Sequence, residues 1–129
     1  MQVLKHSGEV ASLQRVITRA LEGATPPTAL FIVHPYHYLA VAAILAAKGL
    51  NVPRDISLLC RDDDTCLRYL PVVPSRYVCS PRKVAEAVFS MLIPALSSGA
   101  IRDNVKSVLM LPDFVEGSSI AAPNAIRSK

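Results

Sequence analysis

The sequence predicts an α/β fold with a parallel sheet, because a strand, a helix and a second strand follow one another early in the chain. Residues 29–33 form a continuous apolar run rich in β-branched residues, which is typical of a strand covered on both faces. Apolar residues on nearly every side of the segment 36–48, followed by Gly49, predict a buried helix with a defined end. The second apolar run, 56–60, completes a right-handed βαβ unit with parallel strands.

Upstream of this unit, the sequence predicts one strand and one helix. Val3 and Leu4 are expected to belong to a short opening strand. Residues 9–21 have apolar positions three and four apart, which predicts an amphipathic helix. Ser7 is its expected N-cap, and Gly23 its expected end.

Downstream, prolines interrupt the chain before a brief strand expected at residues 77–79. Residues 81–97 are predicted to form a helix that opens on a proline and has one apolar face. A short strand is expected at 108–111, with pairing extended by 114–115, and a loose tail at 118–129. The order strand, helix, strand, helix, strand with parallel connections places the chain in the α/β class.

Composition narrows the class of protein. The chain has 129 residues, 51% of them hydrophobic, so it forms one domain at most and can bury a core. The net charge of +4 is spread along the chain without a basic stripe or a known DNA-binding motif, so direct contact with DNA is not expected. The longest apolar segment, 39–47, is far shorter than the roughly 20 residues of a membrane span. Three cysteines without CxxC spacing, and no signal-peptide pattern after Met1, predict reduced thiols in a cytoplasmic protein.

Polar side chains follow both strands of the βαβ unit. His34 comes after the first strand, and the run Arg-Asp-Asp-Asp at 61–64 comes after the second. The carboxyl ends of parallel strands meet at one edge, where open α/β sheets bind ligands, so residues 33–35 and 61–63 are expected to lie side by side. A carboxylate such as Asp62 can accept two hydroxyl groups of a sugar.

Structural explanations of the same residues remain open. Asp62 is equally suited to cap the next turn or to pair with Arg61 or Arg68, and Asp63 and Asp64 to capping or solvation. His34 is equally suited to bond a backbone carbonyl at the strand end. A metal site built from histidines and cysteines is disfavoured, because neither the HxxH spacing nor the cysteines match a known ligand pattern.

Three phrases resemble the LacI/GalR (lactose-repressor) family of transcription regulators. PTALFIVHPYHYLAV resembles its PTA-hydrophobic-Asn-Asp-x-x-A-x-G segment, GLNVPRDISLLCRDDD resembles G-L-x-V-P-x-D-I-S-V-x-G-x-D-D, and LPDFVEGSS resembles L-P-x-x-L-V-x-R-x-S. The resemblance covers residues 7–119. It implies a parallel-sheet, three-layer lobe of the periplasmic-binding-protein-like type I fold, in which two lobes close on a small effector.

The resemblance also implies which parts of the family's architecture this chain represents. Residues 1–129 correspond to a single, partial effector-sensing domain: the second lobe with the final helix and strand that cross to the first lobe. The separate DNA-binding domain of the family is absent from this sequence. The helix at 81–97 then lacks its native sheet, and we expect it to dock elsewhere, for instance on a second copy.

The family's functional positions map onto this sequence with departures. His34 and Pro35 stand where the family has asparagine and aspartate, and Cys79 stands near a glutamine that some members use for effector contact. The positions implied for effector binding are His34, Pro35, Asp62, Asp63 and Cys79. The positions implied for the dimer interface are Tyr36, Tyr38, Leu39 and Ala42, with core packing as the alternative.

The predicted function is therefore the effector-sensing and dimerisation portion of a bacterial transcription regulator. The partners this implies are a small-molecule effector (such as a sugar), a second subunit, and DNA only through a domain outside this chain, with no membrane and no cofactor. A solute-binding protein of a sugar transport system is the alternative, and a small α/β enzyme the less favoured one. Catalysis is not expected, because the sequence holds no nucleophile elbow and no glycine-rich phosphate loop.

Overall fold

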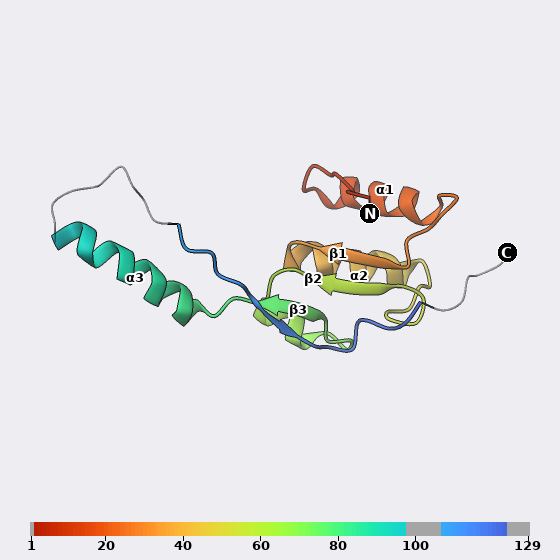
Figure 1. Cartoon of the computed structure of the whole chain (residues 1–129). Helices are drawn as coiled ribbons and strands as arrows, with labels where there is room; N and C mark the ends of the chain where they lie inside the picture. Colours follow the sequence, from red (N-terminus) through yellow and green to blue (C-terminus); the bar gives the residue numbers. More distant parts are fainter. Residues whose placement is uncertain (1, 98–106, 124–129) are drawn as a thin grey trace.

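The computed structural model describes residues 2–97 and 107–123, which form a four-stranded sheet with helices on one face and an extended arm (Figure 1). The sheet has the order β1-β2-β3-β4; β1, β2 and β3 are parallel, and β4 is antiparallel to β3. In chain order the elements are α1 (Val10–Leu21), β1 (Ala29–Ile32), α2 (Pro35–Ala47), β2 (Ser57–Cys60), the 3-10 helix η1 (Thr65–Tyr69), β3 (Ser75–Val78), α3 (Pro81–Ser97) and β4 (Asp113–Val115).

The βαβ unit has the register that the sequence predicts for parallel strands. Ala29 pairs with Ser57 at one end and Ile32 pairs with Cys60 at the other, so both strands end at the same edge of the sheet. The connecting helix α2 packs its buried residues onto this sheet and forms the centre of the core, with Leu45 and Leu58 fully buried. Burial of such a leucine stabilises the fold by about 1.5–3 kcal/mol.

Three local predictions are wrong. Val3 and Leu4 do not form a strand, and neither do residues 108–111; pairing begins only at Asp113, and it is antiparallel. The chain returns along β3 after α3, which forces this opposite direction. Ser7 does not cap α1: the N-cap is Glu9, without a side-chain bond.

The tail is held more firmly than the sequence predicts. The backbone N–H of Leu58 donates to the carbonyl of Ser119 (2.9 Å), and the N–H of Ala121 donates to the hydroxyl of Ser57 (3.1 Å). Ser119 is fully buried, and its hydroxyl donates to the carbonyl of Leu58 and accepts the N–H of Ser75. Residues 118–121 therefore lie beside the first half of β2, while residues 124–129 of the expected loose tail lie outside the described residues.

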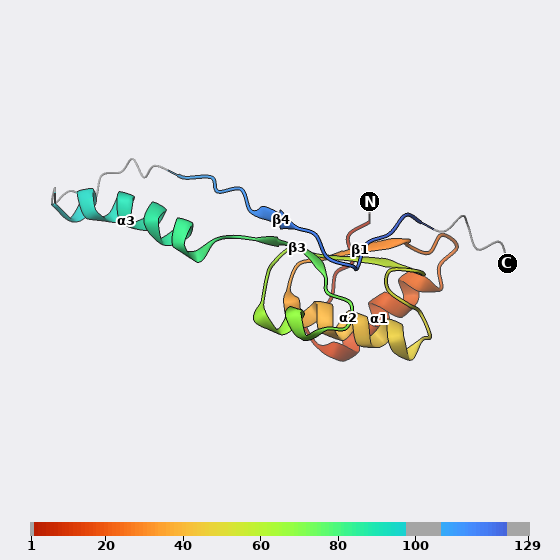
Figure 2. The same cartoon turned by 90° about the horizontal axis from the view of Figure 1, so that it is seen from below.

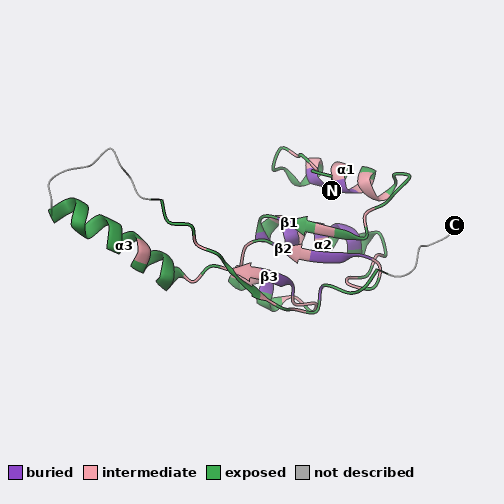
Figure 3. Cartoon of the chain, in the orientation of Figure 1, coloured by how far each residue is buried: buried purple, intermediate pink, exposed green. Residues whose placement is uncertain are grey.

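Helix α3 projects away from the sheet (Figures 1 and 2). None of its described side chains is buried, and Figure 3 shows it almost wholly exposed. The exposed large apolar residues of α3 are Val84, Val88, Phe89, Met91, Leu92, Ile93 and Leu96. A contiguous apolar surface of this kind marks a contact surface in soluble proteins. No helix in residues 2–97 or 107–123 is long and apolar enough to cross a membrane.

Candidate functional site

The two strand ends of the βαβ unit lie next to each other, as predicted. The N–H of Arg61 donates to the carbonyl of Ile32 (2.7 Å), which continues the ladder just past β2. The imidazole Nδ1 of His34 lies 4.0 Å from a carboxylate oxygen of Asp62. Parallel pairing thus brings together two side chains that are 28 positions apart in the sequence, at the edge where α/β sheets bind ligands.

Asp62 forms a two-pronged ion pair with its neighbour Arg61. Arg61 Nε donates to one carboxylate oxygen and Nη2 to the other, both at 2.8 Å. These bonds hold the pKa of Asp62 below its usual value, so the carboxylate is ionised at neutral pH. Both side chains remain partly exposed, at 51% for Arg61 and 39% for Asp62. A ligand hydroxyl can therefore reach this ion pair, which offers both hydrogen-bond donors (Arg61) and acceptors (Asp62).

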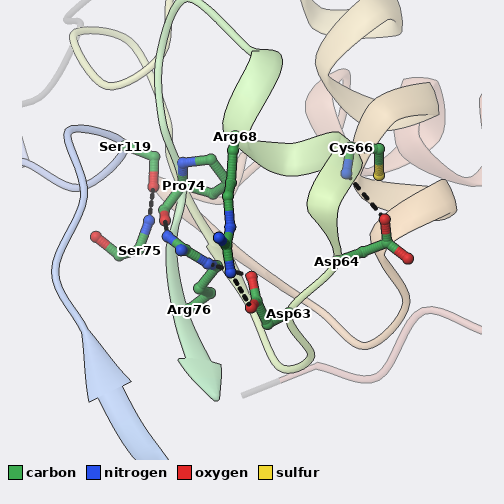
Figure 4. Close-up of polar contacts among 8 residues, drawn as sticks. All are labelled: Asp63, Asp64, Cys66, Arg68, Pro74, Ser75, Arg76 and Ser119. Carbon is green, nitrogen blue, oxygen red and sulfur yellow. Dashed lines mark hydrogen bonds and ion pairs between the residues drawn. The ribbon is translucent and has the colours of Figure 1, made fainter.

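Asp63 is one of the positions implied for effector binding, but in the structure its carboxylate binds two arginine side chains of the same chain (Figure 4). One of its oxygens accepts a bond from Arg76 Nε (2.5 Å), and the other accepts a bond from Arg68 Nη2 (3.2 Å). Arg76 is 8% exposed and also donates to the carbonyl of Pro74. Burial works to raise the pKa of Asp63, but the bonds from the two arginines outweigh it and hold the pKa below its usual value.

For Asp64, the prediction that its side chain caps the following turn is confirmed. Its side chain accepts the backbone N–H of Cys66 at 2.9 Å and so caps η1 (Figure 4). This bond lowers the pKa of Asp64. The three adjacent aspartates therefore have three separate roles: Asp62 is available to a ligand, Asp63 holds a buried arginine and Asp64 caps a helix.

A hollow of about 420 Å³ lies between the end of β2, η1 and the end of β3. Asp62, Asp63 and Cys79, three of the positions that the resemblance implies for effector binding, line it. Arg68 and Tyr77 also line it, although neither was among the residues predicted to bind the effector. The signal available was the position of Tyr77 near the end of β3, the strand next to β2 in the sheet.

His34 and Pro35 lie apart from this hollow. His34 instead lines a separate apolar crevice beside β1, and Pro35 is buried as the first residue of α2. A proline at that position is explained by helix initiation, because its fixed φ suits the first turn and its missing N–H is not needed there. We therefore keep His34 as a contact candidate and assign Pro35 a structural role.

Three histidines cluster beside this edge. The rings of His6 and His37 lie 4.6 Å apart, and those of His34 and His37 lie 5.4 Å apart, both edge to face. Burial, followed by repulsion from His6 and His34, lowers the pKa of His37. Within the described part of the chain, no group of three or more potential ligands is arranged to hold a metal ion. Sequence spacing could not reveal His6, because it lies 31 positions before His37 and meets it only in the folded chain.

The cluster predicts a pH dependence of stability. Because the folded pKa of His37 lies below its unfolded value, the unfolded chain binds more protons as the pH falls through about 6.5, and the free energy of unfolding decreases. Urea unfolding at a series of pH values between about 7 and 5 measures this slope, and His37→Gln should flatten it. In a His6→Gln variant, an NMR titration should show a higher pKa for His37, since one repelling ring is gone. A His37 that titrates at or above the ordinary histidine value contradicts this prediction.

The four residues expected at a dimer interface have different environments. Tyr36 is 72% exposed on α2 and is free to meet a partner. Tyr38 is only 1% exposed and belongs to the core, so the core-packing alternative applies to it. Leu39 and Ala42 are partly buried against the same core. Only Tyr36 of this set presents a large side chain to solvent.

Comparison with known proteins identifies the fold. The model of the periplasmic binding protein-like domain family matches residues 2–120. Among curated proteins, none matches the sequence. A LacI family transcriptional regulator from Bifidobacterium animalis subsp. lactis is 19% identical with a TM-score of 0.78, over 95% of this chain and 44% of that chain.

Two further solved structures contain sugars. A LacI family transcriptional regulator from Enterococcus faecium with bound ribose is 14% identical with a TM-score of 0.74, over 95% of this chain and 44% of that chain. A LacI family transcriptional regulator from Arthrobacter sp. in complex with lactose is 16% identical with a TM-score of 0.75, over 90% of this chain and 43% of that chain. This chain thus spans less than half the length of each of these three structures, and at these identities the likeness establishes the fold.

Proposed function

Because this chain belongs to the periplasmic binding protein-like domain family, we propose that it is part of the effector-sensing module of a bacterial transcription regulator. The observation that carries the proposal is the placement of His34 and the Arg61–Asp62 pair at one edge of a parallel sheet. Solved structures of this fold include LacI family regulators with ribose and with lactose. We propose that the effector is a polyhydroxylated molecule of this class.

The chemistry of the edge suits hydroxyl groups. Asp62 can accept a ligand hydroxyl while it stays bonded to Arg61, and the free donors of the guanidinium can bind a ligand oxygen. His34 can add one bond through its imidazole. The effector would bridge this lobe and a second one, and would favour the closed arrangement by binding it more tightly. A dimer would then transmit the change to DNA-binding domains outside this chain, in the cytoplasm.

This role for Asp62 and His34 predicts a loss of effector affinity. In the complete regulator containing both lobes, Asp62→Ala is expected to weaken binding of the sugar it responds to by about tenfold to a hundredfold, since one charge-assisted hydrogen bond contributes about 1.5–3 kcal/mol. His34→Ala should weaken it less, because an imidazole nitrogen supplies one hydrogen bond, whereas a carboxylate can accept several. Isothermal titration with a sugar selected from a thermal-shift panel that includes ribose and lactose provides the measurement.

Glu22→Ala provides the matched control, because Glu22 is an exposed carboxylate that pairs only with Lys48 in the described structure and does not line the candidate site. It should leave the affinity unchanged. Undiminished affinity in both Asp62→Ala and His34→Ala would remove these two residues from the site.

The exposed arm predicts self-association of the 129-residue chain. The apolar residues of α3 have no cover within the described structure, so we propose that two copies bury them against each other or exchange them. Light scattering at several concentrations should give a mass above that of the monomer. Replacement of Leu92 and Leu96 by Lys should restore the monomer, whereas the same change at the exposed polar positions Arg82 and Glu86 should not. A monomer that is stable at every concentration would contradict this prediction.

A further inference from the structure

The hollow between β2, η1 and β3 carries more positive than negative charge. Arg61, Asp62, Asp63 and Arg68 line it, and the buried Arg76 bonds to Asp63 as well. The pKa of both carboxyl groups lies below its usual value, so both are ionised at neutral pH. These three arginines and two aspartates therefore leave one positive charge without a counter-charge among them.

The uncompensated charge lies on Arg68. Arg68 and Arg76 both reach the carboxylate of Asp63 (Figure 4), but Arg76 is the closer partner, at 2.5 Å against 3.2 Å. A buried charge has to be paired within the protein, and the side chain of Arg76 is 9% exposed. The side chain of Arg68 is 61% exposed. The charge of Asp63 therefore serves Arg76 first, and the guanidinium of Arg68 remains available to a ligand.

Both arginines of the hollow have hydrogen-bond donors to spare. Arg68 donates to Asp63 through Nη2, while its Nε and Nη1 make no hydrogen bond within residues 2–97 and 107–123. Arg61 donates to Asp62 through Nε and Nη2, which leaves its Nη1 without a bond among the described residues. A guanidinium group only donates, whereas a carboxylate only accepts. The hollow thus offers a ligand more charged donors than charged acceptors, and the donors are concentrated at Arg68.

We propose that the effector is a polyhydroxylated molecule with one anionic group, a carboxylate or a phosphate, and that Arg68 binds this group. The planar fork of a guanidinium matches two oxygens of either anion and binds them with charge-assisted hydrogen bonds. The hydroxyl groups of the same molecule lie toward Asp62, which repels an anion and accepts hydroxyl donors. This inference rests on the effector-sensing function proposed above and specifies the chemical class of its ligand.

The size and lining of the hollow suit such a ligand. Its volume of about 420 Å³ is within the range of small-molecule pockets. The half-buried Tyr77 contributes an aromatic wall, against which the carbon atoms of a sugar can pack. A neutral sugar would leave the charge of Arg68 uncompensated. If a carboxylate of the second lobe neutralises Arg68 instead, acids and neutral sugars will bind alike, which the following experiment detects.

Matched ligand pairs test the proposal in the complete regulator with both lobes. The pairs are gluconate and glucitol, galacturonate and galactose, and ribose 5-phosphate and ribose, whose members differ chiefly in charge. A thermal-shift screen selects the pairs that bind, and isothermal titration measures both affinities. We expect the anionic member of at least one pair to bind at least tenfold more tightly than its neutral counterpart. This ratio should fall as NaCl rises from about 50 to about 500 mM, since salt screens the exposed charge of Arg68. The carboxylate and phosphate pairs distinguish the two anions.

Arg68→Gln tests whether this residue recognises the anion. Glutamine keeps a polar side chain but has no charge, so the ratio of the anionic to the neutral affinity should fall at least tenfold. Arg68→Lys keeps the charge without the fork and should recover part of the ratio. Arg15→Gln is the matched control, because Arg15 is exposed on α1 and bonds only to the carbonyl of Ala11 in the part of the chain that the structure describes. It should leave the ratio unchanged, and urea unfolding verifies that each variant is folded.

The outcomes separate this inference from the function on which it rests. Equal affinities within every pair that binds, or an anion preference that persists in Arg68→Gln, would overturn the assignment of Arg68 and leave the sensing of a polyhydroxylated effector in place. If neither member of any pair binds, the proposed sensing function fails together with this inference.

Discussion

Replacing Asp63 with alanine is expected to lower the free energy of unfolding by about 3–5 kcal/mol, because it leaves the buried guanidinium of Arg76 without its counter-charge. The side chain of Arg76 is only 9% exposed and that of Asp63 16% exposed. Arg76 would keep one bond, to the carbonyl of Pro74, which does not neutralise its charge. Urea unfolding followed by circular dichroism measures the loss.

Asp62→Ala is the matched control, since it removes the neighbouring carboxylate from an exposed pair. Surface ion pairs contribute about 0–1 kcal/mol, so we expect little change in stability. Asp63→Asn retains an acceptor for Arg76 and should fall between the two. Equal losses for Asp62→Ala and Asp63→Ala would show that the arginine is not held in the way the geometry indicates.

The pH dependence of stability offers a second readout of the same contact. The folded pKa of Asp63 lies below its unfolded value, so its contribution is present above the unfolded pKa of about 3.9 and is lost as the pH falls below it. In Asp63→Asn the acid limb of the stability curve should be shallower than in the unchanged chain.

The sequence predicted the βαβ unit well because its signals are local. A continuous apolar run, a helix ended by Gly49 and a second apolar run suffice to define parallel strands whose ends meet. From this alone follows the proximity of His34 and Asp62, which the structure confirms. The class of fold and the edge that carries the candidate site were therefore predictable.

The features that were missed depend on contacts distant in sequence. The direction of β4 follows from the path of the chain after α3, and the burial of Ser119 follows from its place beside β2. Neither has a local signature. The separate roles of Asp62 and Asp63 could not be told apart either, since the choice depends on where Arg76 lies after folding.

The crossing of two distant segments at Gly117 leads to the second large effect. A Cβ atom at this position would lie 2.3 Å from the carbonyl oxygen of Val73 and 2.5 Å from the carbonyl carbon of Pro74. The N–H of Gly117 donates to the hydroxyl of Ser75 (3.0 Å), and the N–H of Ser118 donates to the carbonyl of Val73 (2.8 Å), so the segments are bonded at the crossing. The obstacle is backbone, which cannot rotate away as a side chain can.

Gly117→Ala is therefore expected to lower the free energy of unfolding by about 3 kcal/mol, the upper part of the range for overpacking. Gly23→Ala is the control, because a Cβ there would meet carbonyl oxygens at 3.5 and 3.6 Å, which are ordinary contacts. Neither glycine has a positive φ, so the two changes differ in space rather than in backbone conformation. At Gly23 we expect a change of less than about 1 kcal/mol, toward greater stability, as the unfolded chain loses freedom. If the two variants unfold at the same urea concentration, the close crossing at Gly117 does not hold the tail against β2, and the buried position of Ser119 must be secured by its own hydrogen bonds.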